Sequence, residues 1–325
     1  MEFPRRTFFF LTVGAAALPA IPRAAGAQTY PTRPVQLVVP FPPGGSTDVV
    51  ARLLGQWLST RLGQPFIVEN RPGAGTNIAT EMVVRAPPDG YMLLLITPPS
   101  AINATLYHDL KFEFIRDIAP ISAVMRAPFA MAVNPLLTAQ TVPEFIAYAK
   151  TNPGRITMAS SGIGSGPHLA GELFKMMAGV DMIHVPYHGG APAMTDLLGG
   201  QVLLYFASTP EVVEHVKTGR LRVLAVTTTE RSDALPDVPT MNEFLPGFEA
   251  SYWVGFGAPK DTPVQFIDRL NAQINAALVE TEIKARLADL GGMRLGGPPS
   301  DFGELIEAET EKWAKVIKFA KISAE

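Results

Sequence analysis

The stretch "RPVQLVVPFPPGGSTDVVARLL", residues 33–54, decides the fold. Its valine-rich apolar run at residues 35–41 predicts a buried strand. Two prolines and two glycines break the run, and Ser46, Thr47 or Asp48 can cap the amphipathic helix that follows. A strand, a glycine loop and a helix in this order indicate an α/β fold, with the loop at the carboxyl end of the strand.

The same order of elements repeats along the chain. After the first helix, the sequence predicts strands at 66–70 and 91–97 and a helix at 78–85. The pattern restarts with strands at 129–135, 155–160, 182–187, 202–207 and 220–228, and helices at 142–150, 169–177 and 193–198. A proline-rich segment, 235–246, is expected to cross back to the first half, and two helices, 264–279 and 302–321, to finish the chain. The restart predicts two lobes, each a mostly parallel sheet flanked by helices.

The composition of the chain excludes several classes of function. The 325 residues include 27 lysines and arginines against 30 aspartates and glutamates, a formal net charge of −3. This balance argues against a nucleic-acid partner, which usually requires a basic surface. The chain has no cysteine, so disulfides, cysteine-ligated metals and thiol catalysis are excluded.

The N-terminus has the pattern of an export signal. Arg5 and Arg6 precede an apolar stretch at residues 8–18, and small residues offer a cleavage site after Ala27. The apolar stretch is shorter than the roughly 20 residues that a membrane-spanning helix needs. The arginine pair fits either a general secretory signal or a twin-arginine signal. We therefore expect residues 1–27 to be removed and the mature protein to lie outside the cytoplasm.

Three glycine loops follow predicted strands, at residues 42–48, 71–77 and 160–168. Each leaves backbone N–H groups at the N-terminus of a helix, where the helix dipole favours an anion without any side-chain charge. Loops of this kind lie at the carboxyl ends of strands, where open α/β sheets bind ligands. Three such loops, shared between two lobes, predict a site for a small carboxylate. The alternative is that each loop is only a connecting turn.

Nucleotide, catalytic and metal motifs are missing. The loop "PPGGSTD" lacks the lysine of a phosphate-binding loop, and Ile78 stands where a dinucleotide fingerprint has a small residue. No serine lies in a Gly-x-Ser-x-Gly pattern. His184 and His188 are four apart, but Pro186 between them prevents the regular helix that would bring both to one metal. The sequence predicts a binding site with no catalytic residue, metal or cofactor.

Two further side chains have alternative roles. His168 follows a glycine loop at a predicted helix start, so it either donates to a ligand or ties the loop. Asp196 lies near a predicted turn facing the cleft, so it either contacts a ligand or is a solvated residue near a helix end. The sequence leaves both alternatives open.

Several long stretches resemble one known family. They are "YPTRPVQLVVPFPPGGSTDVVAR", "GQPFIVENRPGAGTNIAT", "PPDGYMLLLIT", "HVPYHGGAPAMTDLLGGQV", "GRLRVLAVTTTERSDALPDVPT" and "WVGFGAPKDTP". In this order they resemble the Bug-type receptors of tripartite tricarboxylate transporters. The resemblance runs from Tyr30 to the C-terminus.

The resemblance implies a periplasmic binding protein of the type 2 fold, with a ligand cleft between two lobes. Residues 28–125 and 245–325 would form one lobe, and residues 126–244 the other. The implied ligand is a di- or tricarboxylate, an acidic amino acid or an aromatic acid, held mainly by backbone N–H groups and water. The receptor would deliver it to the membrane permease subunits of the transporter. In an alternative, the ligand-bound form signals to a membrane sensor protein.

The resemblance also implies which residues line the cleft. One wall would comprise Phe41, Pro43, Gly44 and Gly45, with Gly73, Ala74, Gly75, Thr76 and Thr97 beside them. The opposite wall would comprise Ser160, Ser161, Gly162, Ser165 and His168, with Tyr187 and Asp196 completing the pocket. The chain departs from the family where "TPPSAIN" replaces a Gly/Ser-rich turn, because two prolines stiffen that wall and remove N–H donors. It also has His188 where relatives carry lysine.

Overall fold

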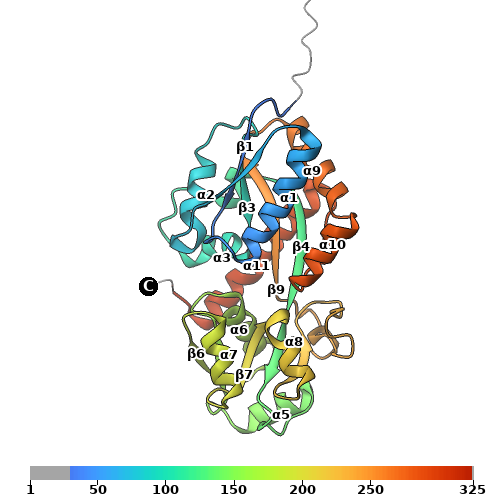
Figure 1. Ribbon diagram of the computed structural model, residues 1–325. Helices are drawn as coiled ribbons and strands as arrows, with labels where there is room; N and C mark the ends of the chain where they lie inside the picture. Colours follow the sequence, from blue (N-terminus) through green and yellow to red (C-terminus); the bar gives the residue numbers. More distant parts are fainter. Residues whose placement is uncertain (1–29, 324–325) are drawn as a thin grey trace, which may run out of the picture.

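The computed structural model describes residues 30–323, and Figure 1 shows two lobes stacked end to end. The upper one, which we call the first lobe, contains β1, β3, α1, α2 and α3, together with α9 and α10. The lower one, the second lobe, contains β6, β7 and α5 to α8. The predicted two-lobed α/β fold is confirmed. The export signal and its cleavage site lie outside the described residues.

The first lobe is built around a parallel sheet. Strand β1, Val35–Val39, lies between β2, Phe66–Asn70, and β3, Met92–Ile96, and is parallel to both. Four of its five side chains are buried, which explains its continuous apolar sequence. The helices that follow these strands are α1, Ser46–Leu62; α2, Asn77–Val84; and α3, Pro98–Leu106.

The second lobe repeats the arrangement. Strand β5, Thr157–Ser160, lies between β6, Ile183–Pro186, and β7, Leu204–Ser208, again in parallel. Its helices are α5, Val142–Thr151; α6, Gly166–Ala178; α7, Gly190–Leu198; and α8, Thr209–Lys217. The sequence analysis did not predict α8 or the earlier α3, both of which begin at a Ser/Thr cap followed by proline.

Two long antiparallel strands join the lobes. Strand β4, Ile118–Val133, pairs with β9, Ser251–Pro259, along its first part. Its last residues pair with β7 and with β8, Arg222–Val226, in the second lobe. The predicted strand began only at residue 129, because Pro120 and Pro128 cannot donate to a ladder and therefore argue against a strand. Shifts in the β4–β9 register accommodate this proline-containing stretch.

The described C-terminal part contains three helices where the sequence predicted two. They are α9, Val264–Ala277; α10, Thr281–Asp289; and α11, Pro299–Ala320. The missed α10 is short and buries only Ile283 and Leu287, too few apolar positions for a clear periodic signal. The smaller elements are α4, Phe114–Asp117; β10, Met293–Arg294, which pairs with β4; and 3₁₀ turns at Ala74–Thr76 and Met241–Glu243.

Helix α11 packs on both lobes. Near its start, Phe302 and Ile306 join the apolar cluster that contains Val38 and Leu94 of the first lobe. Near its end, Trp313, Val316 and Ile317 join the cluster that contains Leu169 and Phe174 of the second lobe. The helix is therefore a third connection, after β4 and the segment leading into β9. The lobe limits at 125/126 and 244/245 stay a prediction.

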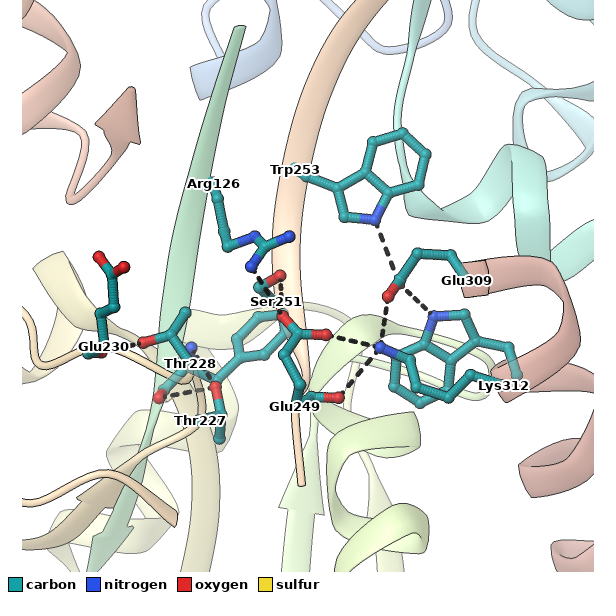
Figure 2. A network of polar contacts seen from close by, with 11 residues as sticks. Arg126, Thr227, Thr228, Glu230, Glu249, Ser251, Trp253, Glu309 and Lys312 are labelled. Atoms are coloured by element: carbon teal, nitrogen blue, oxygen red, sulfur yellow. Dashed lines mark hydrogen bonds and ion pairs between the residues drawn. The ribbon is translucent and has the colours of Figure 1, made fainter. Parts of the chain in front are cut away.

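A buried ionic network lies where these three connections meet (Figure 2). Lys312 of α11 donates to Glu249 Oε2 at 2.6 Å, to the backbone oxygen of Glu249 at 3.0 Å, and to Glu309. Glu309 Oε2 accepts from the indole N–H groups of Trp253 and Trp313. Burial raises the pKa of Glu309, whereas the Lys312 ammonium overcomes burial and lowers the pKa of Glu249.

None of the described helices is both long and apolar enough to cross a membrane.

Candidate functional site

A cavity of about 580 Å³ lies between the lobes. The first lobe and the long strands contribute Phe41, Ser46, Pro98, Met125, Tyr252 and Asp289 to its lining. The second lobe contributes Ser161, Ser165, Gly190, Tyr205, Ser208 and Glu211. These residues lie at or just beyond the carboxyl ends of β1, β3, β5 and β7, and on neighbouring elements. The cavity therefore lies in the interlobe cleft, at the strand ends where open α/β sheets usually bind ligands.

The loop between β1 and α1 forms part of the first wall. Phe41 and Ser46 line the cavity, while Pro43, Gly44 and Gly45 between them are exposed. Helix α1 is capped by the backbone of Gly45, so none of the three expected side-chain caps is used. The first-turn N–H groups of a helix have no partner within it, and they are therefore available to a ligand at this mouth of the cavity.

Asp48 holds this loop in place through hydrogen bonds. Its Oδ2 accepts from the N–H of Gly44 at 2.9 Å, and it also binds the Arg52 guanidinium and the amide of Asn70. The hydrogen bond from Arg52 lowers the pKa of Asp48 to about 2. Gly44 has φ +92°, a conformation that glycine adopts without strain. The N–H of Gly44 is therefore already bonded within the loop.

The predicted glycine loop after β2 forms, but its residues do not line the cavity. Gly73, Ala74, Gly75 and Thr76 have consecutive positive φ angles of 129°, 46°, 60° and 87°. The left-handed conformation is costly for Ala74 and Thr76, so the surroundings must impose it. Asn103 of α3 does so by donating to the backbone oxygen of Gly75. None of these four is among the described residues that line the cavity.

Thr97 occupies the end of β3, directly before the two cavity-lining prolines Pro98 and Pro99. The prolines take the first positions of α3, where a missing N–H costs no helical hydrogen bond. Thr97 is fully buried, and neither its hydroxyl nor that of the buried Ser100 has a hydrogen-bond partner among the described residues. Buried hydroxyls without partners are rare and require a water or a ligand atom.

The loop between β5 and α6 forms the opposite wall. Ser161 and Ser165 line the cavity, and Ser165 caps α6. Ser160 and Gly162 lie behind them: the Ser160 hydroxyl is 2.6 Å from His184 Nε2, and the Ser165 hydroxyl donates to the Gly162 oxygen at 2.7 Å. Of the residues predicted for this wall, the structure therefore brings two serines to the cavity and uses the others to shape the loop.

His168 ties the loop and faces away from the interlobe cavity. It is 4% exposed, its Nδ1 accepts from the N–H of Gly164 at 3.0 Å, and its ring stacks on His184 with 3.7 Å between ring centroids. Both histidines line a separate cavity of about 720 Å³ behind the loop. Burial, with His184 and Lys175 nearby, lowers the pKa of His168 to about 3, so the ring is neutral at pH 7. This geometry supports the loop-tying alternative.

Tyr187 and Asp196 pair with each other. The Tyr187 hydroxyl donates to Asp196 Oδ2 at 2.7 Å, and burial together with this carboxylate raises the pKa of Tyr187 to about 12. Neither residue is among the described residues lining the cavity. In this structure the pair ties the loop after β6 to α7.

Sequence analysis missed several polar or aromatic residues of the cavity. Among them, Tyr205 and Tyr252 come from strands β7 and β9, and Glu211 and Asp289 from α8 and α10. Tyr252 is hydrogen-bonded to the Thr47 hydroxyl in the first turn of α1. The sequence "STPE" at residues 208–211 has the Ser-x-x-Glu pattern of a capping box, which signals a helix start at this point.

Comparisons with known proteins show which family the chain belongs to. Residues 50–322 match the tripartite tricarboxylate transporter family receptor. Protein BugT of Bordetella pertussis is 39% identical over 313 residues, covering 95% of this chain and 94% of BugT. The solved structure of R. palustris Rpa4515 with adipate is 38% identical, with a TM-score of 0.76 over 90% of this chain and 99% of that one. MatC (Rpa3494) from Rhodopseudomonas palustris with bound malate is 31% identical, with a TM-score of 0.71 over 89% and 100%.

The family is one of receptors, and the similar structures with adipate and malate are of proteins that hold small ligands. The expectation that the chain is a binding protein and not an enzyme therefore holds. The sequence motifs, the two-lobed fold and the interlobe cavity converge on one conclusion: this chain belongs to the family of tripartite tricarboxylate transporter receptors of the Bug type.

Proposed function

We propose that the protein is a periplasmic solute receptor that binds a small carboxylate in the interlobe cavity and delivers it to a tripartite tricarboxylate-type membrane transporter. One observation carries the proposal: a single cavity of about 580 Å³ is lined by helix-opening loops from both lobes. Adipate and malate, bound by two similar proteins, are carboxylates of a size that such a volume accommodates.

The ligand carboxylate would be held by neutral groups. The first turns of α1 and α6 begin at Ser46 and Gly166, both cavity-lining, and N–H groups at helix N-termini bind anions without a cationic side chain. The hydroxyl of Ser161 adds a donor from the second lobe, whereas the Ser165 hydroxyl already donates to the Gly162 oxygen. Because these donors come from both lobes, a bound carboxylate would stabilise the closed arrangement of the lobes over the open one.

Closure would occur at the three connections. Strand β4, the segment leading into β9 and helix α11 pass between the lobes, so a hinge motion must be absorbed there. The periplasmic location is supported by the export pattern of residues 1–27 and by the family.

A thermal-shift screen tests the proposal. The mature chain, residues 28–325, is refolded from denaturant to remove any carried ligand and then mixed with dicarboxylates, tricarboxylates, amino acids and aromatic acids. At about a hundredfold excess over its Kd, a true ligand stabilises the fold by roughly 2.7 kcal/mol, which raises Tm by several degrees. Stabilisation by one carboxylate class supports the receptor function. A folded protein that no carboxylate stabilises contradicts it.

A further inference from the structure

The charge of the interlobe cavity is unusual for a site that binds an anion. Among the described residues, no lysine, arginine or histidine lines it. Two carboxylates do: Glu211 in the first turn of α8, from the second lobe, and Asp289 at the end of α10, from the first. A ligand in this cavity therefore meets an acidic side chain from each lobe, and burial raises the pKa of Glu211.

The two acids lie where the lobes touch. The chain just after Asp289 packs against the chain just before Glu211, because a Cβ on Gly291 would lie only 2.9 Å from Pro210 Cδ. Figure 1 shows α8 and α10 facing each other across the gap between the lobes. Asp289 is paired with Arg286 at 3.4 Å, but both side chains are more than half exposed, so the pair neutralises little of its charge.

Glu211 is held in place. Its Oε1 lies against Gly190 at the start of α7, where an added Cβ would be 2.7 Å away, and its Oε2 is 3.5 Å from the Tyr205 hydroxyl. The backbone N–H of Ser208 also donates to this carboxylate, which is the glutamate half of a capping box; the Ser208 side chain makes no capping hydrogen bond. These contacts hold the carboxylate beside the cavity and prevent it from turning away when a ligand arrives.

The rest of the lining is largely apolar. Phe41, Phe129, Tyr205 and Tyr252 contribute aromatic surface, and prolines from both lobes add to it. Such walls suit a hydrocarbon or aromatic body between two polar ends. One end can be a carboxylate bound at the helix N-termini. A second carboxylate reaching Glu211 and Asp289 would be repelled by like charge in a site that excludes water as it closes.

We propose that Glu211 and Asp289 set the ligand class: the preferred ligand carries one carboxylate, an apolar body and a cationic amino group that these two acids receive. The inference rests on the proposed function of the same cavity. It predicts a preference different from that expected for a receptor of dianions such as adipate or malate.

Length-matched ligand pairs test the preference by calorimetric titration of the refolded mature chain. Each pair keeps the body and exchanges one carboxylate for an aminomethyl group of similar length: succinate with 4-aminobutanoate, adipate with 6-aminohexanoate, and terephthalate with 4-(aminomethyl)benzoate. In the best-binding pair, the amino acid should bind at least about tenfold more tightly than the dicarboxylate. Tighter binding of the dicarboxylate overturns the inference while leaving the proposed function intact. Failure of every carboxylate to bind overturns both.

The variants Glu211→Gln and Asp289→Asn connect the preference to these side chains. Glutamine retains an acceptor for Ser208 and Tyr205, so the start of α8 should be preserved. Each variant should reduce the ratio of dicarboxylate Kd to amino-acid Kd by about tenfold. The matched control is Glu214→Gln on the same helix, which changes an exposed ion pair with Lys217 and should leave the ratio unchanged. A ratio that is the same in all three variants and the wild type contradicts the assignment.

Discussion

The Lys312 ammonium lies 2.6 Å from Glu249 Oε2 and joins helix α11 to the segment that leads into β9 (Figure 2). Both side chains are about one-fifth exposed, and Glu309, which Lys312 also contacts, is 3% exposed. This pair therefore ties together two of the three connections between the lobes, where we propose that the hinge bends.

Replacing the lysine should be costly. Lys312→Met leaves Glu249 and Glu309 facing each other without their shared cation, so we expect a loss of about 3 kcal/mol in the free energy of unfolding. Denaturant unfolding measures it. The control Lys217→Met removes an exposed ion pair and should change stability by at most about 0.5 kcal/mol. Equal losses in the two variants would show that the network contributes no more than a surface pair.

Gly45→Val should abolish ligand binding and preserve the fold. Gly45 has φ −77°, which valine adopts, and a Cβ there would meet no described atom within 4 Å. The side chain would instead project beside the helix-opening N–H groups proposed to hold the carboxylate. We expect ligand-induced stabilisation to disappear while the Tm of the free protein changes little. Gly45→Ala is the graded control, with weakened binding expected. Full affinity in the valine variant would place the carboxylate elsewhere.

Asp48→Asn should weaken the fold in a pH-dependent manner. The pKa of Asp48 falls from 3.8 to about 2 because Arg52 stabilises the charged form. A lowered carboxyl pKa adds stability above pH 3.8, and this contribution is lost as the pH falls through about 2. We expect the variant to be about 2 kcal/mol less stable at neutral pH, with the deficit shrinking at acidic pH. Urea unfolding across this range measures it. A deficit that is independent of pH contradicts the assigned ion pair.

His168 should make stability rise with pH. Its pKa falls from 6.5 to about 3, mainly by burial, so between these values the unfolded chain binds a proton that the folded chain does not. Stability should therefore decrease as the pH is lowered from about 6.5 towards 3. In His168→Gln, the slope of unfolding free energy against pH should be smaller across this window, whatever the offset caused by the lost hydrogen bond. Identical slopes would mean that folding does not change the pKa of His168, which contradicts the lowered value.

The local α/β pattern was predictable because it depends on short apolar runs and glycine loops. The strands near Val35, Phe66 and Met92, and their parallel order, follow from periodicity alone. The long strand β4 could not be predicted in full, because Pro120 and Pro128 interrupt its apolar pattern. Pairing with the distant strand β9 stabilises it despite these prolines. Pairing between segments more than a hundred residues apart leaves no signal in either segment alone.

The sequence predicted loop residues of the candidate site, but it did not predict the acidic side chains that line the cavity. Ser161 and Ser165 reach the cavity as the glycine loop suggested. His168 does not, since its role depends on stacking with His184, which comes from a different strand. Glu211 and Asp289 could not be anticipated, because only the folded chain shows that their helices meet across the cleft. Which residues bind the ligand stays a prediction.

The proposed function requires the two lobes to close on a carboxylate bound between them. Small-angle X-ray scattering of the refolded mature chain measures this closure, with and without a saturating concentration of the carboxylate that gives the largest thermal shift. We predict a smaller radius of gyration for the bound wild type and no change for Gly45→Val. An unchanged radius in the wild type, with binding established by calorimetry, would contradict closure around the ligand.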